Sequence, residues 1–546
     1  MSGARAFALV AWIAAGALVA GCGGGSGGAA AHGTASAAAH RSGAQDGHDA
    51  TGSGGAAVSA AAGQALPGGR SVSVAVSARP VGRPIRSGFL GFSFEFQAVR
   101  KYTGSDPSAV NPVLVALIRN LTPGQAPVLR IGGDSTDDSY VPAAGARPPA
   151  YLSYRLTPGW LATTAALARE LGARMIMGVN LGANDPRLAA AEARAYVRAF
   201  GAKSIEALEI GNEPNIYSKI TAYRTVLGLP VPTRPRSFGY PQFDRQFHAI
   251  AARLPPLTLA GPAMAVGPTT SPGSWLGSMR GFLAGLPRLA ILTVHRYPLR
   301  NCSVPPSSPQ YPSIPHLLAP YATVALAHSL RAWIQVAHTM HRRLRVDEIN
   351  SVACRGKAGV SDTFASALWA TDALFSLARA GVDGVDLHTL PHAAYELFRF
   401  SHTGGRWHAR VAPVYYGLQL FAQAAPAGSR LLSVTRTGAD SGLSAWATRA
   451  PDGTVRVVLI NEDRAHGANV SLTPPGGSGS AATVERMTAP SVASRGGVAL
   501  GGRSYGASTY TGRLAAPVTS TVAPAAGTLT IAVPRGSAAL VTLPAG

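Results

Sequence analysis

The sequence predicts an α/β protein, a (β/α)8 TIM barrel with a C-terminal β-sandwich domain. Two observations carry this prediction. Between about residues 84 and 427, short apolar runs alternate eight times with amphipathic helical patterns. From residue 428 onward the helical period is lost, and short alternating runs separated by Gly and Pro turns take its place. A length of 546 residues fits a barrel plus an accessory domain.

Each apolar run of the barrel region is short enough for a buried strand and is followed by residues with helical spacing. The expected strands are Gly88–Phe96, Val128–Gly132, Arg174–Asn180, Ala207–Gly211, Leu257–Pro262, Ala290–His295, Leu344–Glu348 and Gly384–His388. The expected helices are Pro112–Leu121, Trp160–Leu171, Leu188–Phe200, Phe243–Leu254, Trp275–Leu283, Tyr321–Met340, Thr363–Ala380 and Val414–Gln423. Eight such units favour a closed barrel over an open doubly wound sheet.

The C-terminal domain is expected to consist of short strands such as Val455–Ile460, Thr528–Val533 and Ala538–Leu543. Near the other end of the chain, Val72–Val81 alternates Val with small polar residues and also predicts a strand. Because the two ends of a chain often lie close together, residues 71–83 are expected to join residues 428–546 in one domain.

The N-terminus has the pattern of an export signal. Arg5 precedes an apolar run, Ala6–Ala20, that is too short to span a bilayer and has the length of a signal-peptide core. The following Gly21-Cys22 completes a sequence that resembles a bacterial lipobox. We therefore expect residues 1–21 to be a lipoprotein signal peptide, Cys22 to be lipidated and residues 22–70 to form a disordered tether. The alternative is an ordinary signal peptide with an incidental Cys.

This pattern predicts a bacterial cell-envelope lipoprotein outside the cytoplasm, held at the membrane by its lipid anchor or released from it. Two further cysteines, Cys302 and Cys354, remain. An even count in an exported chain suggests one disulfide, with two free thiols as the alternative.

The formal net charge of +22 raises nucleic acid as a partner. The Arg residues are scattered singly, and the sequence contains no nucleic-acid-binding module, so we expect no such partner. The charge then serves either to solvate the surface or to attract acidic sugars.

Candidate reactive groups follow the strands, because a barrel of this kind places its active site where strands end at the C-terminal face. Strand four ends in residues 209–215, E-I-G-N-E-P-N, which present Glu213 at the rim, and strand seven ends at Glu348 on the same face. Two such carboxyl groups suit glycoside cleavage, with one as acid and the other as attacking carboxylate. A separation of about 5 to 5.5 Å would mean retention of configuration.

Other polar residues lie at or beyond strand ends and are able to bind sugar hydroxyls. They are Glu95, Asp134, Asn180 and His388, after strands one, two, three and eight. Arg130 precedes a Gly-Gly pair and is expected to ion-pair beneath the two glutamates. The chemistry needs no metal or cofactor, and no ligand cluster in the sequence demands one.

The segment Asn212-Glu213-Pro214 together with Glu348 resembles the strand-four and strand-seven pattern of clan A retaining glycosidases. With Leu129–Ser135, Ser361–Trp369 and Pro413–Gly417, the chain resembles glycoside hydrolase family 79, the β-glucuronidase and heparanase family, over about residues 72–546. The resemblance implies that Glu213 is the acid/base, that Asn212 contacts the sugar 2-hydroxyl, and that Glu348 is the nucleophile. It also implies that Tyr297 hydrogen-bonds the nucleophile; an aromatic platform in the cleft wall is the alternative for that residue.

A carbohydrate substrate is therefore expected, and a glucuronide would bring a carboxylate that cationic donors must meet. Arg296, Arg300 and Arg355 lie near the expected disulfide, and we take Arg355 as the candidate. Two alternatives stay open. One is a clan A glycosidase for a neutral sugar, of the β-glucosidase, xylosidase or arabinofuranosidase type. The other is a lipoprotein that binds carbohydrate without cleaving it.

Overall fold

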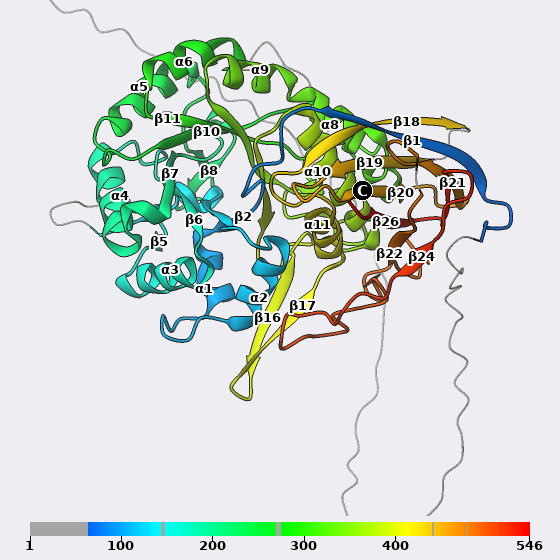
Figure 1. Ribbon diagram of the computed structural model, residues 1–546. Helices are drawn as coiled ribbons and strands as arrows, with labels where there is room; N and C mark the ends of the chain where they lie inside the picture. The colour runs from blue at the N-terminus through cyan, green and yellow to red at the C-terminus, as the bar shows by residue number, and fades with distance from the viewer. Residues whose placement is uncertain (1–63, 143–147, 269–274, 439–441, 478, 546) are drawn as a thin grey trace, which may run out of the picture. The chain divides into compact units, whose positions relative to one another are not determined.

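The computed structural model describes residues 64–142, 148–268, 275–438, 442–477 and 479–545. Eight parallel strands within these ranges close into a barrel, with a ring of helices outside it (Figure 1). In barrel order they are β2 (Leu90–Glu95), β3 (Val128–Gly132), β6 (Arg174–Val179), β7 (Ile205–Ile210), β10 (Leu259–Ala265), β11 (Leu289–His295), β13 (Arg343–Ile349) and β15 (Gly384–Thr389). The predicted TIM barrel is confirmed.

The barrel helices begin where the sequence supplies caps. Asn111, Thr157 and Asp185 each accept hydrogen bonds from the first turn of a helix, and a Pro stands at the start of that turn. The helices are α1 (Phe96–Thr103), α2 (Pro112–Leu121), α3 (Pro158–Leu171), α4 (Pro186–Phe200), α5 (Tyr240–Ala251), α6 (Met279–Gly285), α7 (Ile314–Leu317), α8 (Val324–Ser329), α9 (Arg331–Thr339), α10 (Phe364–Ala380) and α11 (Pro413–Ala424).

The structure corrects the expected continuous helix Tyr321–Met340. It consists of η5 (Pro320–Ala322), α8 and α9. The Ser329 hydroxyl donates to the Leu326 carbonyl at 2.6 Å and so competes with the helical ladder where α8 ends. The expected helix at Trp275–Leu283 is likewise divided into η4 (Trp275–Ser278) and α6, and α1 was not expected.

The loops of the barrel contain short 3-10 helices and short paired strands. The 3-10 helices are η1 (Asp134–Thr136), η2 (Ala202–Ser204) and η3 (Pro214–Ile216), besides η4 and η5. Paired strands are β4 (Ser139–Tyr140) with β5 (Tyr154–Arg155), β8 (Thr221–Arg224) with β9 (Pro230–Pro232), β12 (Leu299–Arg300) with β14 (Val352–Ala353), and β16 (Phe398–Thr403) with β17 (Arg406–Val411).

The C-terminal β domain is a curled sheet of ten strands with its own apolar core, which includes Val74, Val457 and Val541. Its first strand, β1 (Arg70–Val81), pairs with β18 and β21. The others are β18 (Arg430–Gly438), β19 (Leu443–Arg449), β20 (Val455–Asn461), β21 (Ala468–Thr473), β22 (Ala482–Thr488), β23 (Ala499–Leu500), β24 (Ser520–Val522), β25 (Leu529–Val533) and β26 (Ser537–Leu543).

The β domain packs on the barrel helices through aromatic and polar contacts. The Trp446 ring stacks on Phe375 of α10 with centroids 5.7 Å apart, and its indole N–H donates to Asp372 at 2.6 Å. Such a buried contact gives the amphipathic Trp both an apolar surface and a partner for its polar atom. The contact braces α10, which follows the loop after β13.

The predicted signal peptide, Cys22 and most of the predicted tether lie outside the described residues. The last residues assigned to the tether are described: the Leu66 amide donates to Asn469 at 2.7 Å, and the Arg70 amide donates to Gly467 at 2.9 Å. Residues 66–70 are thus held at the β domain. Within the described ranges, no helix has the length and apolar character required to cross a membrane.

Candidate active site

The two predicted glutamates lie close together at the C-terminal mouth of the barrel. Glu213 follows β7 and Glu348 lies near the end of β13. One carboxylate oxygen of each and one ring nitrogen of His295 all lie within 4.8 Å of one another. The side chains of Glu213 and Glu348 are 18% and 12% exposed, so both reach solvent through the barrel mouth. The neighbouring Gly211 adopts a φ of 80°, and a Cβ there would lie 2.8 Å from Leu181, so only glycine fits this turn.

Glu348 is surrounded by hydrogen-bond donors and cationic groups. The Tyr297 hydroxyl donates to Oε1 at 3.0 Å, and Arg130 Nη1 donates to Oε2 at 2.8 Å. His295 and His388 each place Nδ1 3.8 Å from Oε2. Burial alone would raise the pKa of Glu348, but the electrostatic effects of His388, His295 and Arg130 together outweigh it and hold that pKa well below its ordinary value. The carboxylate is therefore kept ionised, as a nucleophile requires.

Tyr297 keeps its own proton. Burial, followed by the negative charge of Glu348, raises the pKa of the Tyr297 hydroxyl well above its ordinary value. The hydroxyl thus remains a donor to Glu348. The predicted hydrogen bond from Tyr297 to Glu348 is thus present in the structure.

Arg130 lies fully buried beneath the site and joins three strands. Its Nε donates to Glu209 at 2.7 Å and its Nη2 donates to the Asn212 side-chain oxygen at 2.9 Å, in addition to the contact with Glu348. The expectation that Arg130 pairs with both rim glutamates is therefore corrected in part, because its second ionic partner is Glu209 and not Glu213. The fixed fork of donors suits several acceptors at once.

The buried layer below Glu348 holds more carboxyl groups than cations. Arg130 faces Glu209, Asp347 and Glu348. Among the described residues, no donor reaches either oxygen of Asp347 or Glu209 Oε1. Burial and then the charge of Glu209 raise the pKa of Asp347 well above its ordinary value. Burial acts on Glu209 in the same direction, but Arg130, Asp347 and His295 together outweigh it and lower the pKa of Glu209. Asp347 is therefore the carboxyl group of this pair that takes up a proton more readily.

His295 connects this layer to Glu213. Its Nδ1 lies 3.0 Å from Glu213 Oε1, and its Nε2 lies 3.2 Å from Arg130 Nη2. Because a guanidinium only donates, we assign Nε2 as the acceptor and Nδ1–H as the donor to Glu213. His295 was not among the residues predicted from the sequence, although it immediately precedes Arg296 and Tyr297. The signal was its position as the last residue of a barrel strand.

Four predicted residues form a network beside the two glutamates. Asn212 Nδ2 donates to Asp134 at 3.2 Å, and the Asp134 amide donates to Glu95 at 3.1 Å. His388 Nε2 lies 3.7 Å from Glu95. Asp134 is exposed at the barrel mouth, and partial desolvation there, followed by the charges of Glu95, Glu213 and Glu348, raises its pKa above the ordinary value. The network therefore combines hydrogen-bond acceptors with an acid that takes up a proton more readily than an ordinary Asp.

Asn180 does not join this set. Its side chain is fully buried; Nδ2 donates to the carbonyls of Asp137 and Ser139, and Oδ1 accepts from the Ala183 amide. Because all its polar atoms already have backbone partners, we withdraw it as a sugar-binding candidate. It holds together the loops after β3 and β6.

Asp137 is a residue that sequence analysis missed. Its Oδ1 accepts from the amides of Leu181 and Gly182, at 3.0 and 2.7 Å. Its Oδ2 accepts from the Tyr217 hydroxyl at 2.6 Å and the Asn212 amide at 3.3 Å. Asp137 thus fixes the backbone that presents Asn212 and Glu213.

The expected disulfide between Cys302 and Cys354 is present. The adjacent Arg355 is exposed with a φ of 67°, and its carbonyl accepts from the Ala394 amide at 2.8 Å. This contact carries the chain to Tyr395, whose ring lies 5.8 Å from His388 and 6.3 Å from Tyr297. Tyr395 was not predicted, because it lies in no recognisable sequence motif. The backbone contact between Arg355 and Ala394 thus joins the loop of the disulfide to the segment that carries Tyr395.

The arrangement can stabilise one carboxylate as an anion while a second carboxyl group stands beside it. Glu213, His295 and Glu348 also offer donor atoms of the kind that bind metals. Both oxygens of Glu348, however, already accept hydrogen bonds from Tyr297 and Arg130. The geometry is that of proton transfer and nucleophilic attack.

The C-terminal part of the chain matches a known family of domains. Residues 445–540 match the model of the glycosyl hydrolase family 79 C-terminal beta domain. A β-glucuronidase of Neurospora crassa is 22% identical over 448 residues, which cover 74% of this chain and 78% of that protein.

Solved structures share the fold. A 4-O-α-L-rhamnosyl-β-D-glucuronidase from Fusarium oxysporum is 20% identical with a TM-score of 0.67, covering 86% of this chain and all of that one. A family 51 arabinofuranosidase from Xanthomonas axonopodis pv. citri is 15% identical with a TM-score of 0.59, covering 87% of this chain and all of that one. Taken with the match of the β domain, these findings identify the chain as a glycoside hydrolase similar to the members of glycoside hydrolase family 79.

Proposed function

We propose that the protein is an exported, β-glucuronidase-like enzyme that cleaves glycosides with retention of configuration. One observation carries the mechanism: the carboxylate oxygens of Glu213 and Glu348 approach within 4.8 Å. Retaining glycosidases keep their two carboxyl groups about 5 to 5.5 Å apart, whereas inverting enzymes need about 6.5 to 9.5 Å to admit a water molecule.

The surroundings of each glutamate support its assignment. Tyr297 and Arg130 bind the two oxygens of Glu348, so this carboxylate attacks the anomeric carbon and forms an ester as the bond to the leaving oxygen breaks. Glu213 gives its proton to that oxygen. In the second step Glu213 takes a proton from water, whose oxygen attacks the anomeric carbon and frees Glu348.

A glucuronide is the proposed substrate. The names of the Neurospora and Fusarium relatives support this choice, as does the position of Arg355. Arg355 is exposed, and its backbone contacts Ala394, next to Tyr395 at the edge of the site. A guanidinium there can bind a carboxylate with two parallel hydrogen bonds. Glu95, Asp134 and Asn212, from the network beside the two glutamates, are proposed to bind the sugar hydroxyls.

Export and lipidation are proposed from the sequence of the first 22 residues alone. A Cys22→Ser variant should leave the membrane fraction while the wild type remains in it. Equal partition of the two proteins would count against the lipid anchor.

The activity is tested with p-nitrophenyl glycosides that share one leaving group and differ only in the sugar. We expect hydrolysis of the β-glucuronide, with β-configured glucuronic acid as the first product in proton NMR. The matched β-glucoside, β-xyloside and α-arabinofuranoside serve as controls. Turnover of a neutral glycoside without turnover of the glucuronide would refute the proposed substrate, and an α-configured first product would refute retention.

A further inference from the structure

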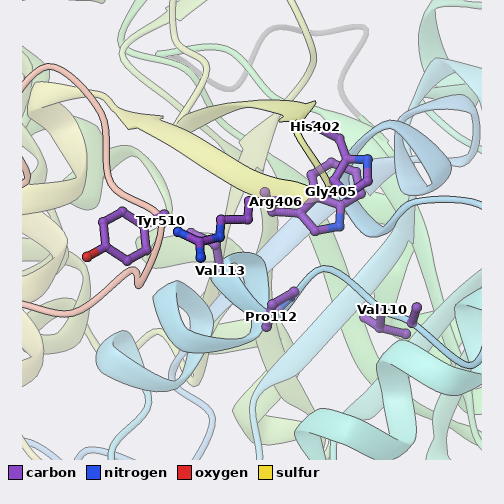
Figure 2. A pocket seen from close by; sticks show the side chains of 9 residues that line it. Val110, Pro112, Val113, His402, Gly405, Arg406 and Tyr510 are labelled. Atoms are coloured by element: carbon purple, nitrogen blue, oxygen red, sulfur yellow. The ribbon is translucent and has the colours of Figure 1, made fainter.

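A second recess lies apart from the two glutamates, between the β16–β17 hairpin, the start of α2 and a loop of the β domain. It has a volume of about 510 Å³. His402, Arg406 and Trp407 line it from the hairpin, Pro112 and Val113 from α2, and Tyr510 from the β domain. Figure 2 shows the Arg406 side chain pointing toward Tyr510, with Pro112 nearby. None of the chemistry proposed above uses this recess.

The recess exists because the apolar face of the hairpin extends beyond the helix that supports it. Phe398 and Phe400 pack edge-on against Tyr102 of α1, at 5.4 and 5.9 Å between ring centroids. Farther along the hairpin, His402 lies 4.8 Å from Trp407 with no ring of α1 against that pair among the described contacts.

The Trp407 ring is positioned by close packing. A Cβ at Gly104 would lie 3.0 Å from Trp407 Cζ2, so the loop after α1 fits against the indole only because residue 104 is glycine. The half-buried indole is thus held at the recess by the loop and by His402. On the other side, Tyr510 is 63% exposed, so its ring is open to solvent.

The charge of the recess is positive. Arg406 has no ion pair among the described residues, and no Asp or Glu lines the recess. The first turn of the ten-residue helix α2 adds the partial positive charge of a helix N-terminus. Aromatic rings present flat apolar surfaces that suit the C–H faces of a sugar, and a free guanidinium suits a carboxylate.

From this combination we propose that the recess binds a uronate-bearing glycan, with Trp407 and Tyr510 against sugar faces and Arg406 on a sugar carboxylate. The proposal rests on the proposed function, because it extends the same class of substrate to a second site. The hairpin follows directly from the segment that carries Tyr395. His402 stands four strand residues beyond Phe398, about 13 Å along the hairpin at about 3.3 Å per residue, so the recess would take a part of the glycan beyond the part that lies at Tyr395.

The test measures binding without relying on turnover. The probe is a hyaluronan hexasaccharide, which carries alternating glucuronates, titrated calorimetrically into the Glu348→Gln protein. Adding Arg406→Ala or Trp407→Ala to that protein should weaken binding about tenfold each, the loss expected for one charge-assisted contact or one aromatic platform. Arg410→Ala is the matched control, because Arg410 is an exposed arginine of the same hairpin that does not line the recess.

Two results would overturn the proposal: equal binding by the Arg406→Ala, Trp407→Ala and parent proteins, or equal weakening by Arg410→Ala. Cellohexaose, a neutral chain of the same length, should not displace the acidic hexasaccharide, and displacement at equal concentration would refute the assignment to acidic glycans. Turnover of p-nitrophenyl glucuronide by the single variants in the otherwise wild-type protein should be unchanged. That assay measures the proposed activity independently of binding at the recess. A failure of either proposal can therefore be told apart from a failure of the other.

Discussion

The two sides of the active site treat their glutamates differently. Glu348, on the β13 side, receives the Tyr297 hydroxyl and the Arg130 guanidinium and has two imidazoles nearby. Glu213, on the β7 side, has His295 as its one side-chain donor among the described residues and is somewhat more exposed. The difference teaches that the fold concentrates donors and the charge of Arg130 on the carboxylate proposed as the nucleophile. It leaves solvent access to the one proposed as the acid/base.

Among the variants that test this comparison, Glu213→Gln is expected to have the largest effect, a loss of kcat/KM. General acid catalysis contributes about 10²- to 10⁴-fold. For methyl β-glucuronide, whose leaving group methanol needs a proton from the general acid, kcat/KM should fall by that amount. A dinitrophenyl glucuronide, whose leaving group needs no proton, should lose far less in kcat/KM. Equal losses with both leaving groups, measured at steady state, would remove Glu213 from the acid role.

The buried charge layer predicts a large effect on stability. Replacing Arg130 by Met leaves Glu209 and Glu348 without their shared cation, so the free energy of unfolding should fall by about 3 to 5 kcal/mol. Urea unfolding measures the change. Arg343→Met is the control: Arg343 pairs with Glu206 but is 31% exposed, and its loss should cost at most about 1 kcal/mol. Similar losses in the two variants would contradict the proposed importance of the buried layer.

The pH dependence should move when a donor to Glu348 is removed. The folded protein lowers the pKa of Glu348, so kcat/KM is lost on the acid side only as pH falls through that low value. Tyr297→Phe removes one hydrogen bond to the anion and raises this pKa. The acid limb should therefore shift upward by about one pH unit, the equivalent of about 1.4 kcal/mol. A pH profile with an unmoved acid limb would mean that Tyr297 serves only as a wall of the cleft.

The smallest effect is expected at Asp347. The pKa of Asp347 is raised in the native protein, so the group holds its proton to a higher pH there than in an unfolded chain, which releases it above about pH 4. The native state then binds more protons than the unfolded state, so this group lowers stability as pH rises above that value. Asp347→Asn preserves a donor to Glu209. It should change the free energy of unfolding by under about 1 kcal/mol at about pH 4 and flatten its decline toward neutral pH. Marked destabilisation at neutral pH would show that Asp347 is ionised.

The sequence was sufficient for the barrel and for the two glutamates because both leave local signals. Strand and helix periods follow from nearby residues, and Glu213 and Glu348 stand where strands end. The paired β16–β17 hairpin and the break after Ser329 were not predicted, because short local hydrogen bonds decided them.

The contacts between side chains within the site could be learned only from the three-dimensional structure. That Arg130 bonds Glu209, that Asp347 is left without a donor, and that His295 reaches Glu213 all depend on which side chains of different strands meet. Asn180 shows the opposite error, because its place at a strand end suggested sugar binding while the surrounding backbone carbonyls use its amide. A strand end predicts proximity to the site but not the direction of a side chain.

The assignment of Glu348 as nucleophile is tested most directly by trapping. A 2-deoxy-2-fluoro-β-glucuronyl fluoride slows both steps of a double displacement but releases fluoride readily, so the covalent intermediate should accumulate. Intact-protein mass spectrometry should then find one added fluoroglucuronyl group, and peptide mapping should place it on Glu348, with no label on the Glu348→Gln protein. A label on another residue, or complete turnover without a trapped species, would contradict the account.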